Sequence, residues 1–269
     1  MPHTHLDHAP KHTHKHEIVQ SSSPTLAKAP SAGRRSIESL RNKHKGKEVW
    51  VLGTGPSMDD YPDDFFDDKV SIGTKGNFKA FPNCTFFIVS IGYRKAQNFL
   101  GQKPESFKKF ILTMRTQSPF SPDWVPKKYR KQAIYMWDRR INVRRSDQAI
   151  LITESIKRIK QKQSSSYPHD DNIAHLALQA AAVMGAKKIT LVGCEDKGFY
   201  AERYRGFYSN KRYGPNVSSE RLKKKWASGV RHRKANRLFA KALKRHGIKL
   251  ALYHYKGSKQ YKAGYLKLA

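Results

Sequence analysis

The clearest chemistry in this sequence lies in a glycine-rich turn that follows an apolar run at residues 49–52. Two glycines permit a tight turn and a close approach of backbone to a phosphate or ribose, and a following helix start would favour an anion. The turn lacks the third glycine of a dinucleotide-binding motif and the Gly-Lys-Ser/Thr ending of a P-loop, and its proline removes one backbone donor. A ligand loop and an ordinary connection therefore both remain open. The residues of the turn are Gly53, Thr54, Gly55, Pro56 and Ser57, of which Ser57 supplies a hydroxyl.

Acidic residues and a histidine offer further polar chemistry. Glu195 and Asp196 follow another apolar run and are suited to bind a ribose or a metal-bound phosphate, or else to pair with Lys197 or Arg203. His232 lies among arginine and lysine neighbours, whose positive charges favour the neutral ring that accepts a proton. The same neighbours also describe a histidine on a solvated basic face.

These residues must be positioned by short strands and amphipathic helices that alternate along the chain. Asn172 is placed to cap a helix that ends at Gly185, and a second helix over residues 235–243 stops before Gly247. This alternation predicts an α/β fold with a doubly wound, mainly parallel sheet and helices on both faces. Ligands of such folds bind at the carboxyl edge of the sheet. The apolar runs that predict strands are residues 49–52, 70–72, 85–90, 110–114, 133–137, 189–192 and 248–252.

The domain organisation follows from local composition. Residues 1–45 are rich in histidine and lysine, bury little, and are expected to form a disordered tail. Residues 46–269 are expected to form one domain, with an irregular insertion around 116–168 and a basic helix–strand unit at the C-terminus.

The overall composition limits the classes of protein to consider. The chain has 269 residues, with 53 Lys and Arg against 21 Asp and Glu, so its formal net charge is +32. Such a charge predicts polyanionic partners. Cys84 and Cys194, the only cysteines, exclude a disulfide framework and are expected to be small buried residues. Without an apolar run long enough for a membrane helix or a signal core, we expect a cytoplasmic protein, or one of the host cytoplasm if it is viral.

The residues around the turn resemble a known group of enzymes. The Gly53–Ser57 turn with the Met58–Tyr61 segment resembles the opening of the bacterial lipooligosaccharide sialyltransferases, and of a wider Rossmann-like family that includes an archaeal 6-hydroxymethylpterin pyrophosphokinase. The helix and strand over residues 172–192, followed by Gly193 and Glu195, resemble a second family segment. A fainter match places His232 where the sialyltransferases have the histidine of a Gly-His pair. These matches cover most of residues 48–253.

The resemblance implies a nucleotide-dependent transferase, most closely a sialyltransferase-like glycosyltransferase with a nucleotide-sugar donor and an acidic glycan acceptor. His232 would be the general base, without a cofactor; a pyrophosphokinase-like enzyme would instead need Mg²⁺. This chain departs from the families at Lys75, where they often have an asparagine, and at Glu195 and Asp196, where they have Gly-x-Asp. The alternative class is a non-catalytic basic protein that binds nucleic acid or belongs to an assembly. The nucleotide-binding residues would be Gly53, Thr54, Gly55, Pro56, Ser57, Lys75, Asn77, Asn172, Gly193, Glu195 and Asp196.

Overall fold

The structure is a computed structural model that describes residues 35–90, 93–115, 125–141, 144–162, 166–169, 172–194, 203 and 234–252. Every strand pairing in these ranges is parallel, and the nine-stranded sheet has the order β1-β6-β5-β4-β3-β2-β8-β9. β7 also pairs with β6, beyond the end of β6 that pairs with β1. The strands are β1 (Arg35–Ser36), β2 (Glu48–Leu52), β3 (Ser71–Thr74), β4 (Phe86–Ser90), β5 (Phe110–Arg115), β6 (Ile134–Arg140), β7 (Tyr167–His169), β8 (Lys188–Val192) and β9 (Lys249–Leu252).

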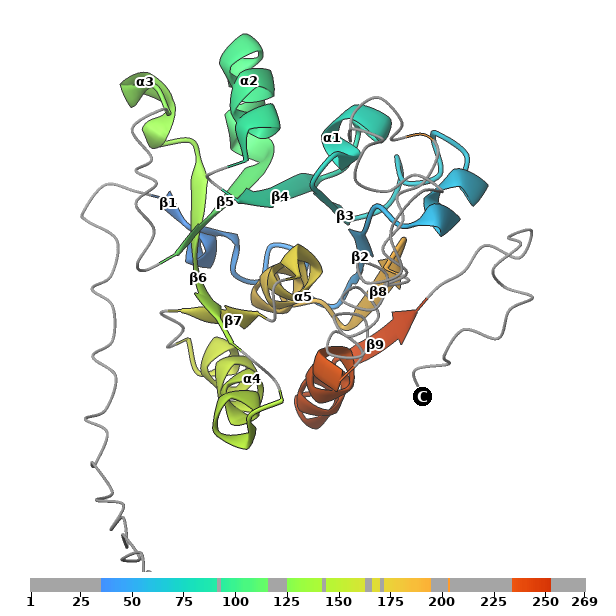
Figure 1. Cartoon of the computed structure of the whole chain (residues 1–269), viewed down its shortest axis with the longest axis vertical. Helices are drawn as coiled ribbons and strands as arrows, with labels where there is room; N and C mark the ends of the chain where they lie inside the picture. Colours follow the sequence, from blue (N-terminus) through green and yellow to red (C-terminus); the bar gives the residue numbers. More distant parts are fainter. Residues whose placement is uncertain are drawn as a thin grey trace, which may run out of the picture.

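Helices cover both faces of the sheet, which curves around one group of them (Figure 1). One face packs against α4 (Ser146–Lys160), α5 (Ile173–Val183) and a helix over residues 234–245. The other face packs against α1 (Asn77–Ala80), α2 (Arg94–Gln102) and the 3-10 helices η2 (Pro56–Asp60) and η3 (Pro104–Lys109). The short helices α3 (Lys127–Arg130) and η1 (Ile37–Leu40) complete the described elements.

Alternation of side chains along each strand divides the apolar residues between two cores. In β4, Phe86 and Ile88 face the α5 side, whereas Phe87 and Val89 face the α1 and α2 side. All these side chains are buried, as expected of parallel strands that are covered on both faces. The strands therefore appear in the sequence as continuous apolar runs without alternating polar residues.

The strand order confirms the predicted doubly wound, Rossmann-like α/β fold. From β2 the chain adds β3, β4, β5 and β6 in turn on one side, and later returns to add β8 and β9 on the other. The direction of winding therefore reverses between β2 and β8, which makes their carboxyl ends the topological switch point of the sheet. The predicted helix and strand at the C-terminus are confirmed as helix 234–245 and β9.

The prediction of a disordered tail up to residue 45 is wrong for residues 35–45. β1 pairs with β6, and Ile37 and Leu40 of η1 are buried in the core under α4 and α5. Arg41 donates from Nη1 to the Ile159 carbonyl oxygen at 2.7 Å, at the end of α4. These contacts escape prediction because only two isolated apolar residues mark the segment. Residues 1–34 lie outside the described residues.

The prediction of an irregular insertion at residues 116–168 is also wrong in part. Besides β6, which the apolar run at 133–137 predicts, this stretch contains the 15-residue helix α4. The apolar side chains that α4 buries completely are Ile152, Ile156 and Ile159, which follow one another at about one helical turn each. This apolar stripe is hard to recognise in the sequence because residues 149–151 beside it are also apolar and break the helical spacing.

Leu40→Ala should lower the free energy of unfolding by about 2–5 kcal/mol, because it leaves a cavity beneath η1. Ser39→Ala is the matched control, since Ser39 is exposed and bonds only with Arg35 among the described residues. Urea denaturation of both variants provides the measurement. Equal stability of the two variants would place η1 outside the cooperative core.

Candidate functional site

The candidate site lies at the carboxyl edge of the sheet, where β2 and β8 end side by side. Leu52 pairs with Val192 in register, so the Gly53–Ser57 turn and the segment that starts at Gly193 leave the sheet at the same level. The chain leaves the two strand ends towards opposite sides of the sheet, and ligands of doubly wound folds bind at such a switch point. The sequence places its two strongest motifs on these two adjacent strand ends.

The glycines of the turn are explained first by the contact between the two strand ends. The Gly53 N–H donates to the Val192 carbonyl oxygen at 2.7 Å, and the Gly55 N–H donates to the Gly193 carbonyl oxygen at 2.8 Å. A Cβ on Gly53 would lie 2.0 Å from the Gly193 oxygen, so no side chain fits there. The predicted close approach of backbone is therefore an approach to β8, and these two N–H groups are already used by protein acceptors.

Gly193 meets a similar restriction. Its φ of +64° lies in the left-handed region, and an added Cβ would come within 2.5 Å of the Met58 side chain. Met58 belongs to η2 and is fully buried. Gly193 thus lets the segment after β8 pass closely over the start of η2.

Asn77 and Thr74 fix the other side of the turn. The Asn77 Nδ2 donates to the carbonyl oxygens of Leu52, Gly53 and Thr74 at 3.0, 2.8 and 2.8 Å, and the Thr74 hydroxyl donates to the Leu52 oxygen at 2.8 Å. Asn77 is fully buried. We therefore assign Asn77 a positioning role, in place of the direct nucleotide contact predicted from the sequence.

Ser57 differs from its neighbours because its hydroxyl has no protein partner. The side chain is fully buried, and no hydrogen bond to the Oγ is present among the described residues. An unsatisfied buried hydroxyl costs about 1–3 kcal/mol, so such groups usually mark a strained or functional position. The helix that follows is a five-residue 3-10 helix, so the expected anion site at the start of a longer helix is not formed here.

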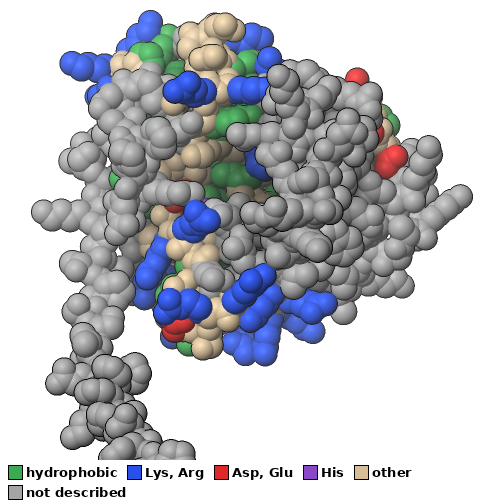
Figure 2. Space-filling view, in the orientation of Figure 1, with side chains coloured by type: hydrophobic (Ala, Val, Ile, Leu, Met, Phe, Trp, Pro, Cys, Tyr) green, Lys and Arg blue, Asp and Glu red, His purple; other side chains and the backbone are tan. Residues whose placement is uncertain are grey.

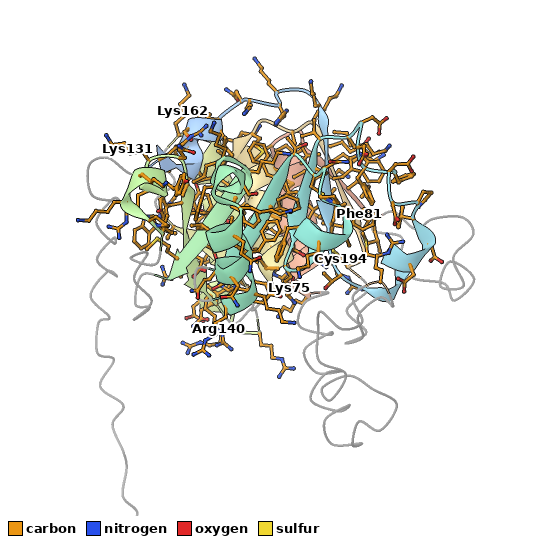
Figure 3. All side chains as sticks on the ribbon, turned by 90° about the horizontal axis from the view of Figure 1, so that it is seen from above. Lys75, Phe81, Lys131, Arg140, Lys162 and Cys194 are labelled. Carbon is orange, nitrogen blue, oxygen red and sulfur yellow. The ribbon has the colours of Figure 1, made fainter. Side chains whose placement is uncertain are left out.

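Lys75 lies next to this turn at the same edge. It is exposed and has φ +50°, a left-handed conformation that a residue with a Cβ rarely adopts. Figure 3 shows Lys75, Cys194 and Arg140 along one edge of the molecule, with Lys131 and Lys162 on the opposite side. The lysine is therefore placed at the carboxyl edge, one residue beyond the end of β3.

Asn172 caps α5 as predicted, since its side chain accepts a hydrogen bond from the Ala174 N–H at 3.0 Å. Within the first turn of α5, His175 is fully buried and its Nε2 lies 3.1 Å from the Asn236 Oδ1. The two helices that start at the carboxyl edge are thereby joined close to their first turns.

The remaining predicted site residues have different outcomes. Glu195, Asp196 and His232 lie outside the described residues. The sequence offers Arg203 as an ion-pair partner of Glu195 or Asp196. In the structure the Arg203 Nη1 lies 3.2 Å from the Asp63 Oδ1. Its guanidinium also donates to the Tyr61 carbonyl oxygen at 2.7 Å and lies over the Phe81 ring. Arg203 therefore bonds to the segment that follows η2.

Sequence reasoning missed a buried polar group further along the same edge. The His169 Nε2 lies 3.7 Å from the Asp138 Oδ1, and both side chains are buried at the carboxyl ends of β7 and β6. The buried Thr113 hydroxyl of β5 has no hydrogen-bond partner among the described residues. The available signal was a polar residue at the end of each apolar run, which is where ligand-binding side chains of parallel sheets are found.

Metal and membrane features were searched within the same ranges. No group of three or more His, Cys, Asp or Glu side chains in the described part of the chain is arranged to hold a metal ion. None of its helices has the length and apolar character that a membrane span requires.

The fold and the candidate site define an α/β protein with a doubly wound parallel sheet whose topological switch point lies between β2 and β8. No protein-family model matches the chain, and no curated protein does. Among solved structures the chain is similar to the MAf glycosyltransferase from Magnetospirillum magneticum AMB-1, at 19% identity and a TM-score of 0.38. The match covers 63% of this chain and 26% of the other. The assignments below rest on this chain's own residues.

Gly53→Ala should destabilise the protein by about 1–3 kcal/mol or more, because its methyl group would overlap the Gly193 backbone oxygen. Gly101→Ala is the control, since a Cβ there meets nothing within 4 Å and lies in helix α2. That control should be neutral or stabilise by up to about 1 kcal/mol. Thermal unfolding measures both, and an unchanged melting temperature for Gly53→Ala would refute the close contact.

The two cysteines should differ in reactivity in the folded protein. Burial raises the pKa of the Cys84 thiol to about 12, so the reactive thiolate is absent near pH 8. Cys194 is only half-buried, at the candidate site. A chromogenic disulfide reagent should label one thiol per native chain, and Cys194→Ser should abolish this labelling. Rapid labelling of native Cys194→Ser would contradict the burial of Cys84.

Proposed function

We propose that the chain is a nucleotide-dependent transferase, most closely a sialyltransferase-like glycosyltransferase that uses a nucleotide-sugar donor. The observation that carries the proposal is the buried, unpartnered Ser57 hydroxyl at the switch point between β2 and β8. A hydroxyl in this position supplies a donor for a phosphate or ribose oxygen, and a bound nucleotide would satisfy it. The adjacent Lys75 supplies positive charge at the same edge.

In this proposal the backbone shapes the site and side chains bind the ligand. Gly53, Gly55, Gly193 and Asn77 hold the turn against β8, because their backbone or amide groups bond within the protein. Lys75 would pair with a donor phosphate as a charge-assisted interaction.

The polar residues of the sequence motifs supply the remaining contacts. Thr54 and Pro56 belong to the turn, and Asn172 lies at the start of α5 at the same edge. Glu195 or Asp196 would hold the ribose or base. These assignments extend the Ser57 and Lys75 contacts along this edge.

The proposed reaction transfers a sugar from the donor phosphate to an acceptor hydroxyl. His232 would accept the hydroxyl proton as the acceptor oxygen forms a bond to the anomeric carbon and the bond from that carbon to the phosphate oxygen breaks. The nucleotide leaves with the bonding electrons, and neighbouring cationic side chains would stabilise its phosphate. An acidic glycan acceptor suits the basic surface of the chain.

A requirement for Mg²⁺ distinguishes the proposed glycosyltransferase from a pyrophosphokinase-like enzyme. Glycosyl transfer of the sialyltransferase type would proceed without a metal, whereas a pyrophosphokinase-like enzyme would need Mg²⁺ for its nucleoside triphosphate. The described residues offer no arranged metal ligands of their own, but a nucleotide phosphate can bring the ion with it.

Nucleotides should stabilise the chain against heat, by about 2.7 kcal/mol at one hundred times the dissociation constant. CMP, CDP, UDP, GDP and ATP are compared with and without Mg²⁺. Stabilisation by a cytidine or uridine nucleotide without Mg²⁺ supports the glycosyltransferase, and stabilisation by ATP only with Mg²⁺ favours the pyrophosphokinase. Failure of all five nucleotides to bind by calorimetry would reject both.

Two variants test the site itself with the nucleotide that stabilises most. Ser57→Ala and Lys75→Gln should each weaken binding about tenfold or more, since a hydrogen bond to a charged group contributes about 1.5–3 kcal/mol. Lys79→Gln removes an equal charge from the exposed face of α1 and serves as the control. Equal affinities for all three variants would remove the Gly53–Ser57 turn from the site.

A further inference from the structure

The edge of the sheet opposite the candidate site gathers exposed lysine and arginine side chains. They come from the loop before β2, the end of α4, the residue before β8, the last turns of helix 234–245, and the start of β9. We call this set the amino-edge basic face. Its members are Lys43, Lys45, Lys47, Lys157, Arg158, Lys160, Lys162, Lys187, Lys241, Lys244, Arg245 and Lys249, all of them exposed.

Backbone hydrogen bonds join these segments into one surface. The loop before β2 donates from Asn42, His44 and Gly46 to the carbonyl oxygens that end α5, at 2.9–3.1 Å. The Lys187 N–H donates to the Lys47 oxygen at 2.9 Å, and the Lys249 N–H donates to the Lys187 oxygen at 3.0 Å. Three of the lysine-bearing segments are therefore neighbours along the edge.

The ends of α4 and helix 234–245 adjoin the same surface. Arg41, next to the loop, bonds to the carbonyl oxygen of Ile159 at 2.7 Å. Burial first, and then the charges of Lys160 and Arg245, lower the pKa of His246. Because Lys160 ends α4 and acts on His246, the end of α4 lies near the end of helix 234–245. Figure 2 is seen from the side of the carboxyl edge, and lysine and arginine side chains are visible there too, over α4 and helix 234–245.

Acidic side chains do not neutralise this face. No member of it forms an ion pair with an acidic group within the part of the chain that the structure describes, and the nearby Glu48 is paired with Lys188 at 2.9 Å. The acidic residues of segment 59–68 gather instead beside η2, on the other face of the sheet. Charge is therefore segregated on the folded chain.

The helix dipole accounts for only part of the pattern. Basic residues in the last turns of α4 and helix 234–245 stabilise those helix ends in any protein. Lys43, Lys45 and Lys47 lie in the loop that is bonded to the end of α5, so three helix ends adjoin the face. Together these ends supply only about 1.5 negative charges against its lysines and arginines. These exposed lysines repel one another, so the face is destabilising unless an anion covers it.

The shape of the face selects a long polyanion over a compact one. Its charges are distributed along an edge built from several elements, and helix C-termini do not offer the N–H groups that hold a single phosphate. Ile150 is the only large hydrophobic side chain exposed among the described residues, so the face lacks apolar anchors for a lipid surface. A phosphodiester backbone carries closely spaced charges that match such a surface.

We propose that the amino-edge basic face binds the phosphodiester backbone of a nucleic acid without reading its sequence. The face lies opposite the candidate nucleotide site, as Lys162 lies opposite Lys75 and Cys194 in Figure 3. Both sites can therefore be occupied at once, and free nucleotide does not displace the nucleic acid. The binding free energy comes mainly from release of counterions and falls as salt rises.

Filter binding of the full chain to a mixed-sequence duplex across a salt series tests the proposal. The triple variant Lys43→Gln, Lys45→Gln, Lys47→Gln should make the log–log salt slope shallower by up to about three units, at about 0.9 per phosphate contact. The control variant removes three exposed charges from α1 and the first turn of α2, through Lys79→Gln, Arg94→Gln and Lys95→Gln. The control should retain the original slope, and a melting curve confirms that both variants fold.

Three results would overturn the proposal. One is no measurable binding near physiological salt, and another is the same change of slope in both triple variants, which would indicate a general effect of net charge. The third is displacement of the duplex by phosphatidylcholine vesicles that contain phosphatidylserine, with the same loss in the loop variant, since this would assign the face to a membrane surface. Retained binding with saturating CMP or ATP supports separate sites.

Discussion

The structure depends most on the close contact between the carboxyl ends of β2 and β8. These strands are adjacent in the sheet although about 140 residues separate them in sequence, and hydrogen bonds from Gly53 and Gly55 extend the pairing past the last strand residues. A Cβ on Gly53 would overlap the Gly193 backbone, so only glycine allows the turn to lie this close to the end of β8. Asn77 then fixes the turn from the β3 side. The Ser57 hydroxyl is left buried and unpaired as a consequence of this arrangement.

The contact between β2 and β8 also shows that the two glycines of the turn serve packing within the protein. A Gly-x-Gly turn usually suggests backbone N–H groups that point at a phosphate. In this chain the N–H groups of Gly53 and Gly55 bond to the end of β8, so they are already occupied by protein acceptors. In the proposed function Ser57 and Lys75 bind the nucleotide; the Ser57 hydroxyl is buried without a hydrogen-bond partner among the described residues, and Lys75 has a left-handed backbone at the end of β3. The glycines of the motif are thus explained by packing against β8, and the nucleotide contact at this turn stays a prediction.

The fold could be predicted from the sequence because parallel strands that are covered on both faces appear as continuous apolar runs, as at β2, β4 and β8.

Two kinds of feature could not be predicted from the sequence. α4 and η1 contribute few apolar side chains, and their burial depends on contacts with elements distant in the chain, such as the bond from Arg41 to Ile159. The polar group of Asp138, His169 and Thr113 depends on strand register, which brings together residues that no local pattern connects. The role of Asn77 likewise becomes visible only once its carbonyl partners are placed.

Sheet polarity explains why lysines from distant parts of the sequence meet at the amino edge. In an all-parallel sheet every segment that leads into a strand arrives at the amino edge, and every segment that leaves a strand departs from the carboxyl edge. Lysines immediately precede several strands of this chain, at Lys47 before β2, Lys109 before β5 and Lys187 before β8. Folding must therefore bring these residues to one edge, although they are scattered in the sequence. Antiparallel strands would have divided the same lysines between two edges. The winding that places the switch point at one edge thus gathers these lysines at the other.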